Sequence, residues 1–90
     1  MPTVHLIIKG KVQGVFYRVR AKKTAYKNGI TGWVRNTPAG DVEMMATASQ
    51  NALDSFIEWC RKGPAAAKVS NVEVTEKEEQ LFDEFTIIRD

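Results

Sequence analysis

The chain has 90 residues, of which 43% are hydrophobic and 27% are charged, and its formal net charge at pH 7 is +2. This length suits one domain with a small core, and the composition is that of a folded globular protein rather than a disordered one. A net charge this small does not by itself indicate a nucleic-acid partner. We therefore expect residues 1–90 to form a single domain.

The cysteine count and the apolar runs exclude further classes of protein. Cys60 is the single cysteine, which excludes an intramolecular disulfide and a cluster of thiolate metal ligands. The sequence contains no charged-then-apolar leader and no apolar stretch long enough to span a bilayer. We expect a cytoplasmic protein that has no membrane partner.

The first third of the sequence predicts a strand, a loop and a helix. Residues 3–9 alternate between two faces, as in a strand, and Gly10 is expected to end it. From Tyr17 onward small and apolar residues recur every three or four positions, which is the helical period. Gly29 follows this run, where a glycine commonly ends a helix.

The middle of the sequence predicts a hairpin followed by a second helix. Residues 31–37 and 42–48 are rich in strand-forming types, and the segment between them, PAGD, is typical of a turn. Ser49 is the expected N-cap of the next helix, with Asn51 as the alternative. Gly63 and the proline after it end that helix. Its apolar stripe is formed by Leu53, Phe56, Ile57 and Cys60.

The last third predicts two strands, and the order of elements then indicates the fold class. Residues 68–75 alternate as in a half-exposed strand, residues 76–83 form a polar loop, and residues 85–89 make a short final strand. The order βαββαβ with an extra C-terminal strand predicts an α+β ferredoxin-like open sandwich, with two helices on one face of an antiparallel sheet. Either of the last two strands can flank the first one.

The loop between the first strand and the first helix carries the strongest functional signal. Two glycines, Gly10 and Gly14, allow the backbone to approach a ligand, and a helix N-terminus offers unpaired N–H groups to an anion. Arg18 falls at the start of the helix, and its guanidinium matches phosphate or carboxylate oxygens in pairs. The sequence thus predicts a phosphate cradle of backbone amides plus Arg18, the alternative being a merely solvated arginine.

No other catalytic apparatus is visible in the sequence. There is no P-loop motif, no metal-ligand spacing, and no nucleophile paired with a base. His5 falls within a predicted strand and Cys60 on an apolar stripe, so both are expected to be structural. Asn36, considered alone, is best explained as a turn residue, and the alternative is an amide that orients water. We expect no metal and no cofactor.

Two stretches resemble signatures of the acylphosphatase family. Residues 10–18, GKVQGVFYR, are similar to the first signature, and residues 32–42, GWVRNTPAGDV, are similar to the second. The resemblance covers nearly the whole chain and implies metal-independent hydrolysis of the carboxyl-phosphate bond of acyl phosphates. It also implies that Arg18 binds the substrate and that Asn36 is the catalytic asparagine. Ala48 stands where the second signature usually has a glycine.

This resemblance makes a small-molecule acyl phosphate the expected partner. An acyl phosphate is a mixed anhydride with a stable carboxylate leaving group, so charge neutralisation and a positioned water are sufficient for its hydrolysis. We expect a monomer. We also expect no binding of nucleic acid, since residues 42–47 contain no aromatic side chain to stack on bases. The alternative is a non-catalytic small-anion or nucleic-acid binding module of the same fold. The expected phosphate-binding residues are Gln13, Gly14, Val15, Phe16, Tyr17 and Arg18.

Overall fold

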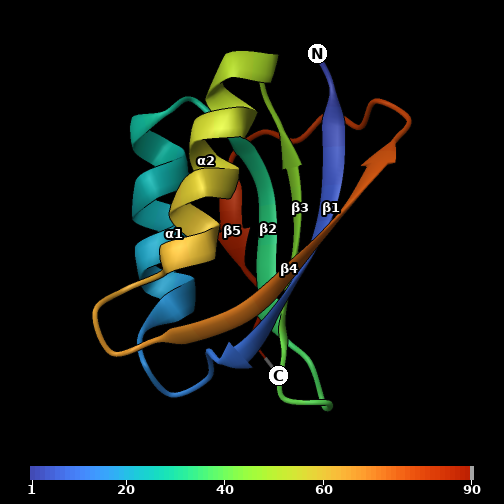
Figure 1. Ribbon diagram of the computed structural model, residues 1–90. Coiled ribbons are helices and arrows are strands. Elements are labelled where there is room, and N and C mark those ends of the chain that lie inside the picture. The colour runs from blue at the N-terminus through green and yellow to red at the C-terminus, as the bar shows by residue number, and fades with distance from the viewer. Residues whose placement is uncertain (90) are drawn as a thin grey trace.

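The computed structural model describes residues 1–89, in which two helices cover one face of a five-stranded sheet (Figure 1). This arrangement confirms the predicted ferredoxin-like sandwich with an extra C-terminal strand. The elements are β1 (Thr3–Lys11), α1 (Tyr17–Lys27), β2 (Thr31–Asn36), β3 (Val42–Thr47), α2 (Gln50–Lys62), β4 (Lys68–Lys77) and β5 (Phe85–Ile87).

The sheet has the strand order β4-β1-β3-β2-β5. β4 therefore flanks β1, which decides between the two arrangements that the sequence left open. β5 lies at the opposite edge and pairs with β2 in parallel, so the sheet is mixed rather than wholly antiparallel. The segment between β4 and β5 crosses to this edge and is fixed near its middle by Gln80. The Gln80 N–H donates to Thr3 Oγ1, and the Thr47 hydroxyl donates to the Gln80 carbonyl.

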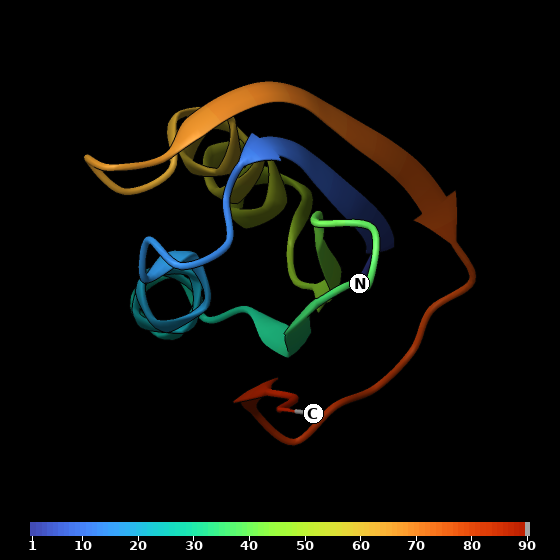
Figure 2. The same ribbon diagram turned by 90° about the horizontal axis from the view of Figure 1, so that it is seen from below.

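Because of the strand directions, the segments that follow β1, β2 and β5 all lie at the same end of the sheet. β1 and β2 both run antiparallel to β3, and β5 runs parallel to β2, so β1, β2 and β5 all point the same way. In the register of the sheet, Val42 at the start of β3 lies opposite both Ile8 of β1 and Asn36 of β2. The loop after β1 and the turn after β2 consequently lie at the same end of the molecule (Figure 2).

The core lies between the helices and the sheet, and one buried tyrosine joins the two helices. The Tyr17 ring lies with its centroid 5.3 Å from that of Trp59, and its hydroxyl donates a 2.8 Å hydrogen bond to the Cys60 carbonyl. The first residue of α1 is thus fixed against the last turns of α2. No helix among residues 1–89 is long and apolar enough to cross a membrane.

Most element boundaries agree with the sequence predictions, and Gly10 is the clearest exception. β1 continues through Gly10 to Lys11, with a shift of register against β4 between Lys9 and Gly10. Gly10 has a φ of +125°, and a Cβ there would lie 2.1 Å from the Lys68 carbonyl oxygen. The glycine therefore permits a bulge and close strand contact instead of ending the strand. Strand β4 likewise extends two residues into the predicted polar loop.

The entry into α2 follows the prediction closely. Ser49 is its N-cap, and the side-chain oxygen of Ser49 accepts a hydrogen bond from the Ala52 N–H, so the alternative cap Asn51 is not used. Ala48, which replaces the usual glycine of the second signature, is buried and does not have a positive φ. The backbone at this position therefore has no need of a glycine in this chain.

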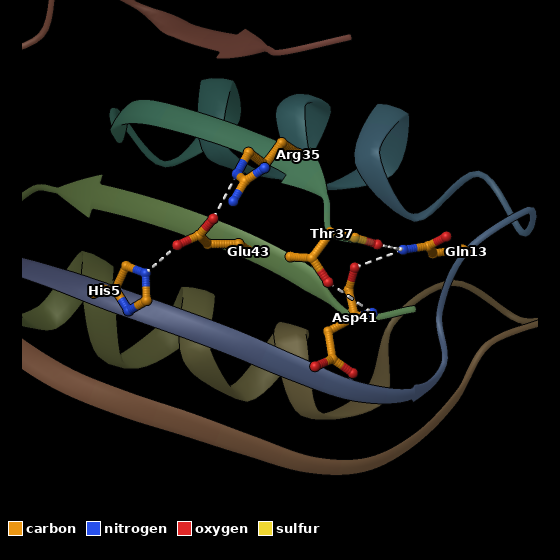
Figure 3. Close-up of polar contacts among 6 residues, drawn as sticks. All are labelled: His5, Gln13, Arg35, Thr37, Asp41 and Glu43. Carbon is orange, nitrogen blue, oxygen red and sulfur yellow. Dashed lines mark hydrogen bonds and ion pairs between the residues drawn. The ribbon is translucent and has the colours of Figure 1, made fainter. Parts of the chain in front are cut away.

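The face of the sheet that the helices leave uncovered carries an ionic cluster around Glu43. His5 Nε2 donates to Glu43 Oε2 at 2.7 Å, and Arg35 Nε donates to the other carboxylate oxygen (Figure 3). Partial burial acts to raise the pKa of Glu43, but the hydrogen bonds and the charge of Arg35 outweigh it, so the pKa lies below its ordinary value of 4.5. His5 is thus a sheet-surface residue, as predicted.

This lowered pKa predicts a pH-dependent contribution to stability. A carboxyl whose pKa is lower in the folded state stabilises that state above its unfolded pKa and loses the effect as the pH falls through the folded pKa. We expect Glu43→Gln to lower the free energy of unfolding by about 1 kcal/mol at pH 7, and the difference from wild type to shrink below about pH 4.5. Urea unfolding at several pH values measures this. Glu78→Gln, at an exposed site, is the control, and a pH-independent difference would contradict the prediction.

Candidate active site

The loop between β1 and α1 is anchored by two buried valines. A glycine lies between them, and a phenylalanine follows the second. Val12 and Val15 are buried in the core. Gly14 has a φ of +73°, and Phe16, the N-cap of α1, has a φ of 63° and a ψ of 23°. These left-handed residues turn the chain sharply into the helix. The loop backbone is therefore held close to the N-terminus of α1.

The N-terminus of α1 has N–H donors that no helix hydrogen bond uses. The helix has no capping side chain and no acidic residue in its first turn. Its first backbone hydrogen bond within residues 1–89 runs from the Arg20 N–H to the Phe16 carbonyl at 3.1 Å. The N–H groups of Tyr17, Arg18 and Val19 therefore have no partner within the helix. Such a helix terminus favours an anion, both through these donors and through the helix dipole.

A cavity of about 390 Å³ opens beside this helix terminus and brings Arg18 and Asn36 together. Among residues 1–89, its lining includes two arginines and no acidic residue, and Arg18 has no ion pair with any residue of this range. Its charge therefore attracts an anion of phosphate size. The lining residues are Val12, Gly14, Phe16, Tyr17, Arg18, Val19, Asn36 and Arg89.

Asn36 ends β2, and its side chain takes no part in closing the turn that follows. The turn is closed by Thr37, whose N–H donates to the Asp41 carbonyl at 2.9 Å and whose hydroxyl accepts from the Asp41 N–H at 3.2 Å. The Gly40 N–H donates to the Thr37 carbonyl. The interpretation of Asn36 as a residue needed by the turn thus finds no support in these bonds. Its half-buried amide lines the cavity instead.

Two of the predicted phosphate-binding residues do not line the cavity. The Val15 side chain is buried in the core. The Gln13 side chain points to the β2–β3 turn, where its Nε2 donates to the Thr37 carbonyl at 2.9 Å and to the Asp41 carbonyl at 2.8 Å (Figure 3). Neither side chain can therefore contact an anion in the cavity, and the prediction for both residues concerns the backbone N–H alone. Gln13 also ties the loop to the turn that follows Asn36.

Arg89 is a cavity residue that the sequence did not indicate. It was expected only as a position on the final strand. The Ile88 N–H donates to the Val34 carbonyl at 2.9 Å, which continues the parallel pairing of β5 with β2 beyond Ile87. This pairing places Arg89 beside the end of β2. No local pattern signals it, because the position depends on a strand pairing between residues about 50 positions apart.

The side chains that most often serve as nucleophile or base lie elsewhere. Cys60 is buried in the core, and burial raises the pKa of its thiol to about 12, so it stays protonated at neutral pH. Burial raises the pKa of Tyr17 as well, and its hydroxyl is engaged with the Cys60 carbonyl. His5 is bound to Glu43 on the open face of the sheet. The cavity thus supplies positive charge, N–H donors and one amide side chain that makes no hydrogen bond within residues 1–89.

A second and larger cavity, of about 610 Å³, lies between α2 and β4. Its lining includes the carboxylates of Asp54, Glu58 and Glu76 beside Arg61 and Lys77. Three carboxylates against two cations make this cavity a poor site for a phosphate group. The cavity at the start of α1, which brings Arg18 and Asn36 together beside the helix terminus, is the candidate active site.

Comparison with known proteins agrees with this assignment. The family model described as acylphosphatase matches residues 4–87. The acylphosphatase of Methylococcus capsulatus is 43% identical over the whole chain and 99% of its own length. The crystal structure of acylphosphatase from Bacillus subtilis superposes with a TM-score of 0.95 at 36% identity, covering 99% of this chain and all of that one. An acylphosphatase structure from Coxiella burnetii gives 0.94 at 37% identity, covering 97% and 92%.

These similarities extend over nearly the full length of this chain and of each relative. They favour the enzyme over the non-catalytic binding module that the sequence left as an alternative. The chain belongs to the acylphosphatase family.

Proposed function

We propose that this acylphosphatase hydrolyses acyl phosphates in the cavity at the start of α1. Backbone N–H groups from Gln13 to Arg18 and the Arg18 guanidinium hold the phosphoryl group, and Asn36 orients the attacking water. The observation that carries this proposal is that Arg18 and Asn36 line one cavity beside the unpartnered N–H groups of a helix terminus. Arg89 adds a second positive charge to the same cavity.

The reaction needs positioning and charge stabilisation but no nucleophilic side chain. The Asn36 amide oxygen accepts a hydrogen bond from the water, which attacks phosphorus in line with the leaving oxygen. The new bond joins the water oxygen to phosphorus, and the bond between phosphorus and the carboxylate oxygen breaks. The carboxylate leaves with its electron pair, and a phosphate oxygen takes the proton of the water. Arg18 and the loop amides stabilise the charge on the phosphoryl oxygens throughout.

The proposal extends to the oligomeric state and the cellular location of the enzyme. A monomer is the simplest assembly, because one chain supplies all the lining of the cavity among residues 1–89. A cytoplasmic location suits a chain whose single cysteine is a buried free thiol. We also propose that the chain works as one domain on a small-molecule substrate and does not bind nucleic acid.

Hydrolysis of benzoyl phosphate in the presence of a chelator tests the proposed function. The purified chain should release phosphate from this anhydride and should leave phenyl phosphate, a stable phosphomonoester, intact. The proposed mechanism requires only the cradle and an oriented water, so the chelator should not reduce the rate. A strict requirement for an added divalent metal ion, or equal turnover of the monoester, would contradict the mechanism.

The contacts of Gln13 predict a role in positioning the loop relative to the turn. Gln13→Met keeps the length of the side chain but removes both hydrogen bonds to the turn carbonyls. We expect kcat for benzoyl phosphate to fall by roughly tenfold, because small displacements of a cradle from the attacking water strongly reduce rate. Steady-state kinetics measure this, and Gln13→Glu, which cannot donate when ionised, should behave similarly. Unchanged kcat in both variants would show that the contact is dispensable.

A further inference from the structure

A large apolar side chain lies exposed at the mouth of the active-site cavity. Phe16 is 76% exposed, and it lines the same cavity as Arg18 and Asn36. It does not belong to the aromatic pairs of the core, which join Tyr17 to Trp59 and Phe56 to its two ring neighbours. The ring therefore contributes little to the packing of the fold.

The backbone of Phe16 is also unfavourable for this residue type. Phe16 is the one non-glycine residue within residues 1–89 that has a positive φ. Glycine or asparagine adopts this left-handed conformation at a lower cost than a residue with a bulky side chain. Exposure of the ring and strain of the backbone both lower the stability of the fold. Folding therefore does not explain why a phenylalanine occupies this position.

A second apolar side chain extends this surface along α1. Val19 lies three positions after Phe16, on the same face of the helix, is 48% exposed, and lines the cavity. Phe16 and Val19 thus form an apolar shelf next to the Arg18 guanidinium. An apolar surface beside a phosphate cradle suits a ligand that is anionic at one end and apolar at the other.

The geometry of the reaction points the acyl group toward this shelf. Water attacks from one side of phosphorus and the carboxylate leaves from the other. Asn36, the proposed water-orienting residue, belongs to strand β2, whereas Phe16 is the N-cap of α1 and Val19 lies in its first turn. With the water held on the sheet side, the acyl group extends to the helix side of the cavity.

We propose that Phe16 and Val19 form a subsite for the acyl part of the substrate, so that this enzyme prefers acyl phosphates with an aromatic or extended aliphatic acyl group. This inference rests on the proposed function. The ring and the valine methyls lose contact with water when such an acyl group binds, which lowers the free energy of the bound state. A small acyl group such as acetyl is too short to gain this contact.

The test compares benzoyl phosphate with acetyl phosphate on three variants. We expect wild type to favour benzoyl phosphate in kcat/KM. Phe16→Asn, in which the new residue tolerates a positive φ, should lower the benzoyl-to-acetyl ratio of kcat/KM by roughly fivefold to tenfold. Val19→Ser should lower the ratio by roughly threefold. Tyr26→Asn removes another exposed ring of α1, one that lies away from the cavity, and should leave the ratio unchanged.

The outcomes separate the subsite from other roles of the ring. A fall of the ratio in Phe16→Asn and Val19→Ser, with Tyr26→Asn unaffected, supports the subsite. An unchanged ratio, or a parallel loss for both substrates, would overturn it, because the ring would then act only on the loop. Should Phe16→Asn fail to fold, as judged by thermal unfolding, Val19→Ser decides alone. Failure of wild type to hydrolyse either anhydride would instead contradict the proposed function.

Discussion

Arg18→Gln should lower kcat/KM for benzoyl phosphate by about a thousandfold and should also abolish inhibition by inorganic phosphate. Glutamine retains a polar side chain of similar reach but loses the charge and the paired donors that match phosphoryl oxygens. Loss of one preorganised donor typically costs roughly a hundred- to thousandfold in rate, and Arg18 supplies more than one. Steady-state kinetics with phosphate as a competitive inhibitor measure both effects.

Two further variants make the Arg18 prediction specific. Arg18→Lys keeps the charge but not the planar fork, so it should retain more activity than Arg18→Gln. Arg20→Gln removes a neighbouring exposed arginine that does not line the cavity, and its kcat/KM should stay within about twofold of wild type. Because Arg18 has no ion pair within residues 1–89, its replacement should leave thermal stability nearly unchanged. Normal phosphate inhibition of Arg18→Gln would refute the assigned role.

Asn36→Ala should lower kcat for benzoyl phosphate by about a hundred- to thousandfold while phosphate still binds. The amide is proposed to orient the water and not to hold the phosphoryl group, so its loss affects the transition state more than binding. The inhibition constant for inorganic phosphate should therefore remain within about threefold of wild type. The same kinetic series measures kcat and the inhibition constant separately.

The comparison with Asn36→Asp sharpens the Asn36 prediction. A carboxylate at this position accepts a hydrogen bond from water but repels the phosphoryl group, so phosphate inhibition should weaken as well. The turn after β2 should be intact in both variants, because its hydrogen bonds are made by Thr37, Gly40 and Asp41. A near-normal kcat of Asn36→Ala would show that some other group orients the water.

The local elements were predictable from the sequence because their signals are short in range. Ser49 caps α2 through a hydrogen bond to a residue three positions away, and Gly63 ends the same helix with a positive φ. Leu53, Phe56 and Cys60, the buried residues of α2, are spaced three and four positions apart, which is the period of a helix. The two signature stretches indicated Arg18 and Asn36. These interactions, apart from the roles implied by the family, depend on neighbours along the chain.

Tertiary structure alone decided which distant segments meet at the candidate active site. Gln13 turned out to bind carbonyls 24 and 28 positions later with its side chain, and Arg89 reaches the cavity through the parallel pairing of β5 with β2. Gly10 was misread as the end of β1 because the approach of Lys68 cannot be read from local periodicity. Strand pairing and side-chain contacts between remote residues are determined by how the whole chain packs. The sequence by itself therefore specified the elements and the signature residues, and the packing of the sheet specified the site that they form.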